Sequence, residues 1–426
     1  MVRVVTLRGH YEKNGDLVFE ISGDLPESSI RSEGQISLDI VENKVVWKKN
    51  NIMFPQGFMV SGGRGLLSAI FCFHPTLSAI GSKLELGIQD ESQDEEESIT
   101  VKTNLPINEK IRLLLSNMWM LPKLKWEIDE KTLGDSIISD GNPTQPLAYG
   151  AGLDSGAAIA MFGKYSTPYH IVTLDSEVRQ GTESILEQFG GCLCETNVKL
   201  AYSISGFPHW CCPYIPALLA GSTTCSTGTI IESQFLRDEK EYNDSRNNLW
   251  LESMRISGLI PTPIYFHSEY NNARIISHFK LEEVVAGNCI EEWGYSKKAL
   301  RKAVLLAPFN DRYIEVIEEL EANGVVLDPK STYSEDSKML SSITLAASLI
   351  KNPGKSITVR NLQSITGFRG NPWVTKAHPE GLDNIPENIK NSIFEVRDKV
   401  GIEVMTDKEI LSMSEYNYQR LWNTVL

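Results

Sequence analysis

The first part of the chain is dominated by short runs in which apolar residues alternate or cluster. Five such runs predict β-strands, at Val2 to Leu7, Leu17 to Ile21, Gln35 to Ile40, Val45 to Trp47 and Lys83 to Leu86. Asn-Gly between the first two runs is a strong hairpin signal. We therefore expect a β-rich N-terminal domain over residues 1–110, with a helical connector over residues 111–145.

From residue 146 the pattern changes to short apolar runs that alternate with helical stretches. The runs that predict strands are Leu147 to Gly150, Tyr169 to Leu174, Lys199 to Ile204 and Thr227 to Ile231. The stretches that predict helices are Asp154 to Phe162, Gly181 to Phe189 and Ile215 to Ala220. This rhythm is typical of βαβ units. It predicts an α/β domain with a Rossmann-like parallel sheet over residues 146–310, with ligands at the carboxyl ends of its strands.

The last part of the chain has helical periodicity. Predicted helices cover Met339 to Ile350, Ile357 to Ile365, Glu387 to Lys399 and Asp407 to Asn417. We expect a helical C-terminal region over residues 311–426.

Net charge, cysteine content and hydropathy restrict the ligands and the cellular compartment that can be expected. The net charge of −14 over 426 residues disfavours a broad nucleic-acid-binding face. Seven cysteines without a paired framework indicate reduced thiols, and no stretch has the pattern of a signal peptide or a membrane span. A cytoplasmic protein is expected, without membrane contact.

One short segment carries a chemical signal. Tyr149 to Ala158 reads as a strand end, a loop of very small residues with Asp154 and Ser155, and an alanine-rich helix start. Such a turn presents backbone N–H groups at a helix N-terminus, which attracts phosphate. It is neither a Walker A loop nor a dinucleotide fingerprint. Taken alone, a tight turn between strand and helix explains it equally well.

The loop resembles the pyrophosphate loop of N-type ATP pyrophosphatases, whose signature is Ser-Gly-Gly-x-Asp-Ser. Gly152, Asp154 and Ser155 match it, whereas Gly150 and Ala151 replace the first serine and the first glycine. The order of loop, strands and helices over residues 145–310 most closely resembles 7-cyano-7-deazaguanine synthase (QueC).

This resemblance implies an ATP site with Mg²⁺. The loop residues Gly150, Ala151, Gly152, Leu153, Asp154 and Ser155 would hold pyrophosphate, with Asp154 as the Mg²⁺ contact. Asp154 and Ser155 would also be catalytic, together with His209 in a substrate-facing loop. The remaining contacts to the nucleotide would come from Asp175, Ser176, Gly228, Thr229 and Glu232.

The chain departs from QueC in two respects. Where QueC keeps three closely spaced zinc cysteines, this chain keeps only Cys289, and one thiolate cannot complete a tetrahedral zinc site. No zinc is therefore expected, and Cys289 is expected to be a buried thiol. The β-rich segment before the loop is also additional. With these two departures, the chain resembles the QueC-like proteins of bacterial anti-phage operons, the Qat and type IV CBASS systems.

The resemblance implies an enzyme that adenylates a carboxylated deazaguanine, or a similar carboxylate. It would then transfer the product to ammonia or to an amine of a partner protein, docked through the β-rich domain. The imperfect loop leaves a second interpretation open, in which a degenerate QueC-like fold serves as a binding module. His267 lacks a partner in the sequence, so a structural role is expected for it.

Overall fold

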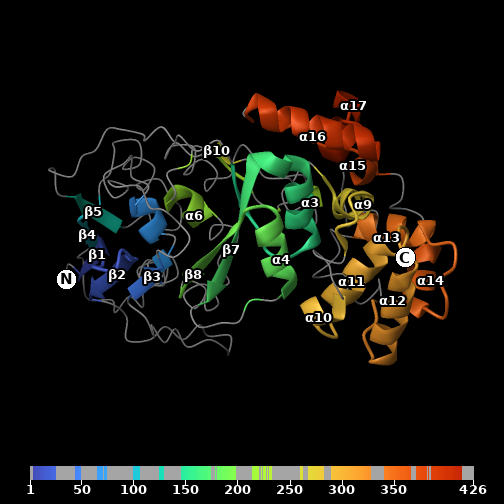
Figure 1. The fold of residues 1–426 in the computed structure, drawn as a ribbon, viewed down its shortest axis with the longest axis horizontal. Coiled ribbons are helices and arrows are strands. Elements are labelled where there is room, and N and C mark those ends of the chain that lie inside the picture. The colour runs from blue at the N-terminus through green and yellow to red at the C-terminus, as the bar shows by residue number, and fades with distance from the viewer. Residues whose placement is uncertain are drawn as a thin grey trace, which may run out of the picture.

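We describe the protein from a computed structural model. The residues it describes are 3–24, 44–48, 65–70, 72–73, 99–105, 124–128, 145–173, 178, 180–197, 214–219, 222, 224–226, 228, 230–232, 260–261, 267–282, 289–327, 340–365, 371–380, 382 and 385–414. The fold is α/β, with one mixed eight-stranded sheet whose order is β5-β4-β1-β2-β3-β8-β7-β6. The N-terminal strands lie at one end of the molecule and α9 to α14 at the other (Figure 1).

The N-terminal half of the sheet contains β1 (Arg3–Tyr11), β2 (Leu17–Gly23), β3 (Lys44–Trp47), β4 (Ile99–Thr103) and β5 (Leu124–Ile128). β1 pairs antiparallel with β2 and parallel with β4, while β2 pairs antiparallel with β3. The hairpin expected at Asn14-Gly15 is confirmed, since β1 and β2 flank it and Gly15 has a φ of 91°. That left-handed conformation explains why glycine stands there.

The second half contains the parallel strands β6 (Gln145–Ala148), β7 (Ser166–Thr173) and β8 (Cys192–Thr196). A short antiparallel contact, Trp47 opposite Thr196, joins the two halves. Asn197 reinforces it, because its side chain accepts from the Val46 N–H at 2.8 Å and donates to the Lys44 carbonyl at 2.9 Å. The β-rich segment and the βαβ segment therefore share one sheet.

The order of the parallel strands reverses at β6. β7 and β8 lie on one side of it, and on the other side Leu147 bridges Ser226, which directly follows β9 (Thr224–Cys225). β9 pairs in turn with β10 (Ile260–Pro261). In parallel sheets such a reversal opens a crevice at the carboxyl ends of the strands, where ligands bind. The small-residue loop follows β6 at this place.

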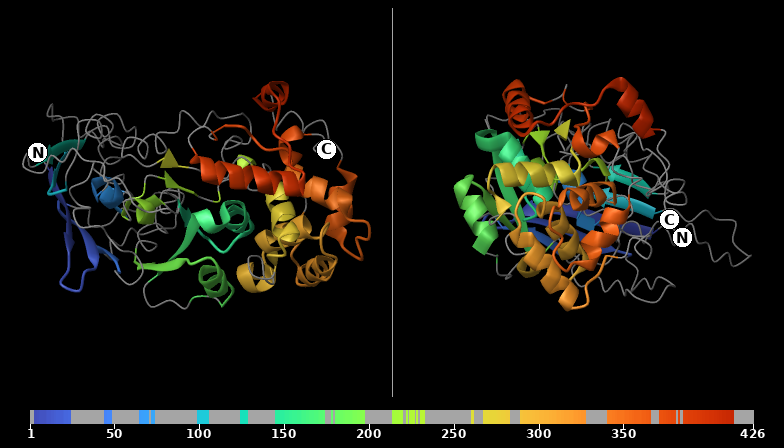
Figure 2. Two further views of the ribbon diagram at one scale, coloured as in Figure 1. Left: turned by 45° about the horizontal axis from the view of Figure 1, so that its top comes forward. Right: turned by 90° about the vertical axis from the view of Figure 1, so that its right-hand side faces the viewer.

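Helices cover the sheet and build the far end of the molecule (Figures 1 and 2). Those within the βαβ segment are α3 (Leu153–Phe162), α4 (Gln180–Gln188) and α6 (Tyr214–Leu219). Next come α9 (Glu269–His278), α10 (Cys289–Trp293), α11 (Lys297–Leu306) and α12 (Arg312–Ala322). The last are α13 (Leu340–Leu349), α14 (Ile357–Ser364), α15 (Pro372–Thr375), α16 (Glu387–Val400) and α17 (Asp407–Ser414).

One hydrophobic core runs from Leu147 to Met413 and crosses the boundary expected near residue 310. α13 and α15 pack on α9, and α16 packs on both α3 and α9. The C-terminal helices therefore complete the core of the βαβ segment rather than forming a separate one. None of the helices in the described ranges combines the length and apolarity needed to cross a membrane.

The sequence patterns and the structure agree best for helices. α3, α4, α6, α13, α14 and α16 match their predicted spans to within one or two residues at each end. The strand predicted at Thr227 to Ile231 is wrong, because β9 ends at Cys225 and residues 231–232 are helical. The helical connector expected over residues 111–145 is wrong where the structure describes it, because β5 occupies residues 124–128 and pairs in parallel with β4. Strands β4, β8 and β10 and helices α9 to α12 and α15 were not anticipated. The runs at Gln35 to Ile40, Lys83 to Leu86 and Lys199 to Ile204 lie outside the described residues.

Candidate functional site

The loop between β6 and α3 has the expected strand–loop–helix context. β6 ends at Ala148, and α3 begins at Leu153 with Gly152 as its N-cap. Gly152 has no side chain, so no side-chain cap bonds to the helix start. The first N–H groups of an α-helix have no intrahelical partners. α3 therefore points uncapped donors and the positive end of its dipole toward the carboxyl end of β6.

The glycines of this loop are not required by the fold. A Cβ built on Gly150 or on Gly152 meets no atom of the described residues within 4 Å. Gly152 has a φ of −109°, which any residue adopts, and Gly150 is not among the glycines with positive φ. Neither packing nor backbone conformation therefore calls for glycine. Open space in front of a small-residue loop is what close approach of a phosphate needs.

Ala151 is the strained position of the loop. Its φ is 55°, in the left-handed region, a conformation that it shares with only one other non-glycine residue in the described ranges, Lys280. A left-handed non-glycine residue persists only where its surroundings hold it, and such residues cluster at binding sites.

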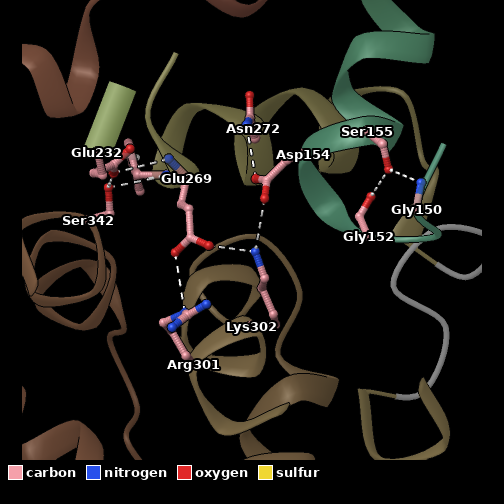
Figure 3. A network of polar contacts seen from close by, with 11 residues as sticks. Gly150, Gly152, Asp154, Ser155, Glu232, Glu269, Asn272, Arg301, Lys302 and Ser342 are labelled. Carbon is pink, nitrogen blue, oxygen red and sulfur yellow. Dashed lines mark hydrogen bonds and ion pairs between the residues drawn. The ribbon is translucent and has the colours of Figure 1, made fainter. Parts of the chain in front are cut away.

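Ser155 holds the loop in shape. Its hydroxyl accepts a hydrogen bond from the Gly150 N–H at 3.1 Å and donates one to the Gly152 carbonyl at 3.3 Å (Figure 3). The side chain is buried, and its hydroxyl closes the loop onto the first turn of α3. In this structure Ser155 is thus a positioning residue for the backbone donors.

Gly228 presses against the same helix start. A Cβ on Gly228 would lie 2.8 Å from the Ser155 backbone nitrogen and 3.2 Å from the Cβ of Asp154. No side chain larger than hydrogen fits there without moving the backbone. Gly228, one of the expected nucleotide contacts, therefore lies against the first turn of α3, although it is not in a strand.

Asp154 turns away from the loop toward α9 and α11 (Figure 3). Its carboxylate accepts a hydrogen bond from the Asn272 side chain at 3.1 Å and lies 3.5 Å from the Lys302 ammonium. The Asp154 side chain is 25% exposed, so it remains accessible from one side. Burial raises its pKa above the ordinary value, and Lys302 opposes that shift.

Lys302 is the buried cation of the site. Its ammonium donates to Glu269 at 2.6 Å, and the other Glu269 oxygen lies 3.4 Å from Arg301. Burial alone would lower the pKa of Lys302, but Asp154 and Glu269 outweigh burial and raise it. For Glu269, burial would raise the pKa, yet Arg301 and Lys302 outweigh it and lower the pKa. Lys302 and Glu269 are therefore both charged at neutral pH.

Glu232 has a different environment from Asp154. Its carboxyl is fully buried and accepts hydrogen bonds from the Glu269 N–H at 3.2 Å and from the Ser342 hydroxyl at 2.6 Å. Burial, reinforced by the neighbouring Glu269 charge, raises the pKa of Glu232 to about 8. Glu232 is thus mainly neutral at pH 7 and occupies the start of α9. Glu232, predicted to contact the nucleotide, instead accepts hydrogen bonds at the start of α9.

The fit of Mg²⁺ to these residues rests on Asp154. Mg²⁺ that arrives with a nucleotide is held mostly by phosphate oxygens and waters and needs only one or two carboxylates. Asp154 meets that need with its exposed side, whereas Glu269 is paired with two cations and Glu232 is protonated. Across the described residues no group of three or more His, Cys, Asp or Glu side chains is arranged for a metal. The accessible side of Asp154 therefore fits contact with a phosphate-borne Mg²⁺.

The other predicted site residues divide into two groups. Leu153 is a buried core residue at the first position of α3, so only its backbone faces the loop. Cys289 is fully buried, as expected, and burial raises its pKa to about 12. His209, Asp175, Ser176 and Thr229 lie outside the described residues.

Sequence reasoning missed the polar residues that α9 and α11 bring to the loop. Lys302, Glu269 and Asn272 lie more than a hundred residues beyond Asp154 in the chain, and no local motif marks them. One signal was available, because Ser268 and Ser296 are N-cap residues just ahead of charged helix starts. That signal predicts the helices but not the face that Lys302 occupies.

The chain was compared with protein-family models, with curated proteins and with solved structures, and none of the three comparisons finds a match. Its site therefore has to be interpreted from its own geometry.

Proposed function

We propose that the protein binds ATP at the loop after β6 and uses it to adenylate a carboxylate. The fold in this proposal is a Rossmann-like ATP pyrophosphatase domain. The observation that carries it is the uncapped start of α3, which lies behind two glycines that the fold does not require, where the strand order reverses. Backbone donors, open space and a helix dipole at a topological switch point together favour a phosphate ligand.

The proposed reaction has two steps. A carboxylate oxygen of the substrate attacks the α-phosphorus of ATP, and the bond to the β-phosphate breaks, which releases pyrophosphate. A nitrogen nucleophile, ammonia or a protein amine, then attacks the acyl carbon and displaces AMP. The resemblance of the loop to N-type ATP pyrophosphatases supports cleavage between the α- and β-phosphates, and the QueC-like order of elements supports a carboxylated deazaguanine as substrate.

The residues of the chain have distinct tasks in this proposal. The N–H groups at the start of α3 bind the departing pyrophosphate, and Ser155 keeps them aligned. Lys302 supplies a fixed positive charge behind Asp154. Preorganised donors and charges of this kind stabilise the negative charge that develops on the leaving group. Mg²⁺, contacted by Asp154, would neutralise phosphate charge when it is bound.

A binding module without catalysis is the second candidate. It is favoured by the ion pair of Asp154 with Lys302, which occupies the carboxylate expected to contact Mg²⁺. In that case ATP or a related phosphate would bind at the start of α3 without turnover. Both candidates require the loop, but only the first requires AMP release.

The test is an assay with ATP, Mg²⁺ and 7-carboxy-7-deazaguanine, alone and with the proteins of neighbouring genes. AMP release and the mass of each protein are measured for the wild type and for Asp154→Ala. The matched control is Asp407→Ala, which removes an exposed carboxylate from the first turn of α17. We expect AMP release that falls about a hundredfold in Asp154→Ala and stays unchanged in Asp407→Ala.

Absence of AMP from the wild type, or AMP release that Asp154→Ala leaves intact, would overturn the enzyme proposal. ATP binding without AMP release would leave the binding module as the function. A mass gain on a neighbouring protein would show that the nitrogen nucleophile is a protein amine.

A further inference from the structure

Arg397 on α16 is a buried cation with incomplete hydrogen bonding. The residue is 2% exposed, and its Nε donates to Nε2 of His267 at 2.9 Å. Its Nη1 and Nη2 atoms have no hydrogen-bond partner, and the ion pairs formed within the described residues do not include it. Burial lowers the pKa of Arg397 to about 10, so it still carries its charge at neutral pH.

His267 cannot neutralise this charge. Burial and the adjacent Arg397 hold the pKa of His267 well below its ordinary value, so the ring is neutral. Because Nε2 accepts the bond from Arg397, the ring proton is on Nδ1. That Nδ1 atom also lacks a partner. Together the pair presents three buried donor atoms for which the described residues supply no hydrogen-bond acceptor.

An unpaired buried charge is among the most destabilising features that a fold can carry. An apolar side chain of similar size would fill the same space without that penalty. The Arg397–His267 pair lies between helices that border the loop after β6. The His267 carbonyl accepts from the Ile231 N–H at 3.0 Å, and His267 immediately precedes the start of α9. α16 is tied to α3 as well, through a bond from Ser392 to the Met161 carbonyl at 2.6 Å.

We propose that Arg397 and His267 form a binding site for a carboxylate. The two free guanidinium nitrogens match the bidentate geometry of carboxylate oxygens, and the Nδ1–H adds a third donor. One cation beside a neutral ring balances one negative charge. A carboxylate satisfies that balance, whereas a phosphate with two charges would leave an excess buried negative charge. Solvent does not reach these donors, so the ligand enters when the contact between α16 and α9 opens locally.

The inference does not depend on ATP binding, and its test uses no nucleotide. Thermal unfolding of the full chain is measured in sodium acetate, sodium phosphate and sodium chloride at equal ionic strength and pH. The variants are Arg397→Met, which removes the charge, and Arg397→Lys, which keeps the charge but loses the fork. Lys399→Met, an exposed position on the same helix, is the control for a surface charge.

We expect acetate to raise the Tm of the wild type and of Lys399→Met by several degrees over chloride, with a smaller rise in phosphate. Arg397→Met should melt higher than the wild type in chloride and gain nothing from acetate. Arg397→Lys should keep less than half of the acetate response.

Three results would overturn the carboxylate site: a wild type that acetate does not stabilise, an acetate response that survives in Arg397→Met, or an Arg397→Met protein that melts lower than the wild type in chloride. The last result would mean that the charge is already paired within the chain. A rise in phosphate that exceeds the rise in acetate and disappears in Arg397→Met would assign the pair to a phosphate and reject the carboxylate, because the general stabilisation by phosphate would remain in that variant.

Discussion

Two neighbouring helices, α3 and α9, meet the same physical demand in opposite ways. Each begins with N–H groups that the helix itself cannot satisfy. At α9 the Ser268 hydroxyl accepts from Asn271, Glu232 accepts from Glu269, and Ser342 accepts from Tyr270. At α3 the N-cap is a glycine and no side chain caps the start. The N–H groups at the start of α9 are bonded to the protein's own oxygens, whereas the start of α3 has no side-chain cap, which supports the proposed phosphate site.

The two helix starts are also connected. Asp154 in the first turn of α3 and Glu269 in the first turn of α9 share the Lys302 ammonium (Figure 3). Helix dipoles favour acidic side chains at both places, and one buried cation balances them. Acidic residues occur in the first turn of both helices, so they do not distinguish the two. The proposed phosphate site is distinguished by the N–H groups at the start of α3, which have no side-chain cap.

The largest expected effect is that of Lys302→Met, which removes the shared cation. Glu269 would remain buried with Arg301 as its only described ionic partner, and Asp154 would keep only Asn272. We expect the free energy of unfolding to fall by about 3 kcal/mol, measured by urea denaturation. Lys297→Met, exposed on the same helix, is the control and should stay within about 0.5 kcal/mol of the wild type. Equal stability of the two variants would show that the ion pairs of Lys302 contribute little to the free energy of unfolding.

The second effect separates binding from folding. Gly152→Val places a branched side chain in the open space before α3, where none of the described part of the chain lies within 4 Å of the added Cβ. Affinity for ATP, measured by calorimetry, should fall about a hundredfold, while stability falls by only about 1 kcal/mol from the poorer N-cap. ATP affinity that Gly152→Val leaves unchanged would remove the loop from the nucleotide site.

The third effect tests the closed start of α9 through pH. The pKa of Glu232 is raised from 4.5 to about 8 in the folded protein. The folded state therefore holds the proton more tightly than the unfolded chain does. The stability from this group is complete below about pH 4.5 and is lost as the pH rises toward 8. Glu232→Gln mimics the protonated acid and should lose this dependence.

The difference in unfolding free energy between Glu232→Gln and the wild type should thus grow across that pH window, by up to about 1.4 kcal/mol per pH unit. Urea denaturation at several pH values measures it, with Glu395→Gln on exposed α16 surface as the control. A constant difference would mean that Glu232 is ionised in the folded protein.

The smallest effect concerns the cap of α9. Ser268→Ala removes the acceptor for the Asn271 N–H and should lower the free energy of unfolding by about 1 kcal/mol. Because α9 is filled by internal partners, ATP affinity should not change. If Ser268→Ala lowered ATP affinity as much as Gly152→Val does, the start of α9 would also take part in ATP binding, and the contrast between the two helix starts would be wrong.

Local sequence predicted the loop well, because its signals are local. The apolar end of β6, the very small residues and the start of α3 follow one another within ten positions. Gly228 could not be assigned correctly in the same way. The run from Thr227 to Ile231 contains β-branched residues, which favours a strand, but the bridge to Leu147 is formed by Ser226, and residues 231–232 are helical. Tertiary contacts overrode the local propensity there.

The sequence by itself determined six helices closely (α3, α4, α6, α13, α14 and α16), the N-terminal hairpin and the backbone loop after β6. Periodicity, turn residues and side-chain size act over a few residues, so they can be interpreted without the fold. Only the tertiary structure decided which charges meet. Asp154, Glu269 and Lys302 come from three helices, and more than a hundred positions separate Asp154 from the other two. Packing places the Lys302 ammonium within 4 Å of both carboxylates. The protonated state of Glu232 and the unpaired charge of Arg397 follow from burial, which belongs to the folded molecule and not to the chain.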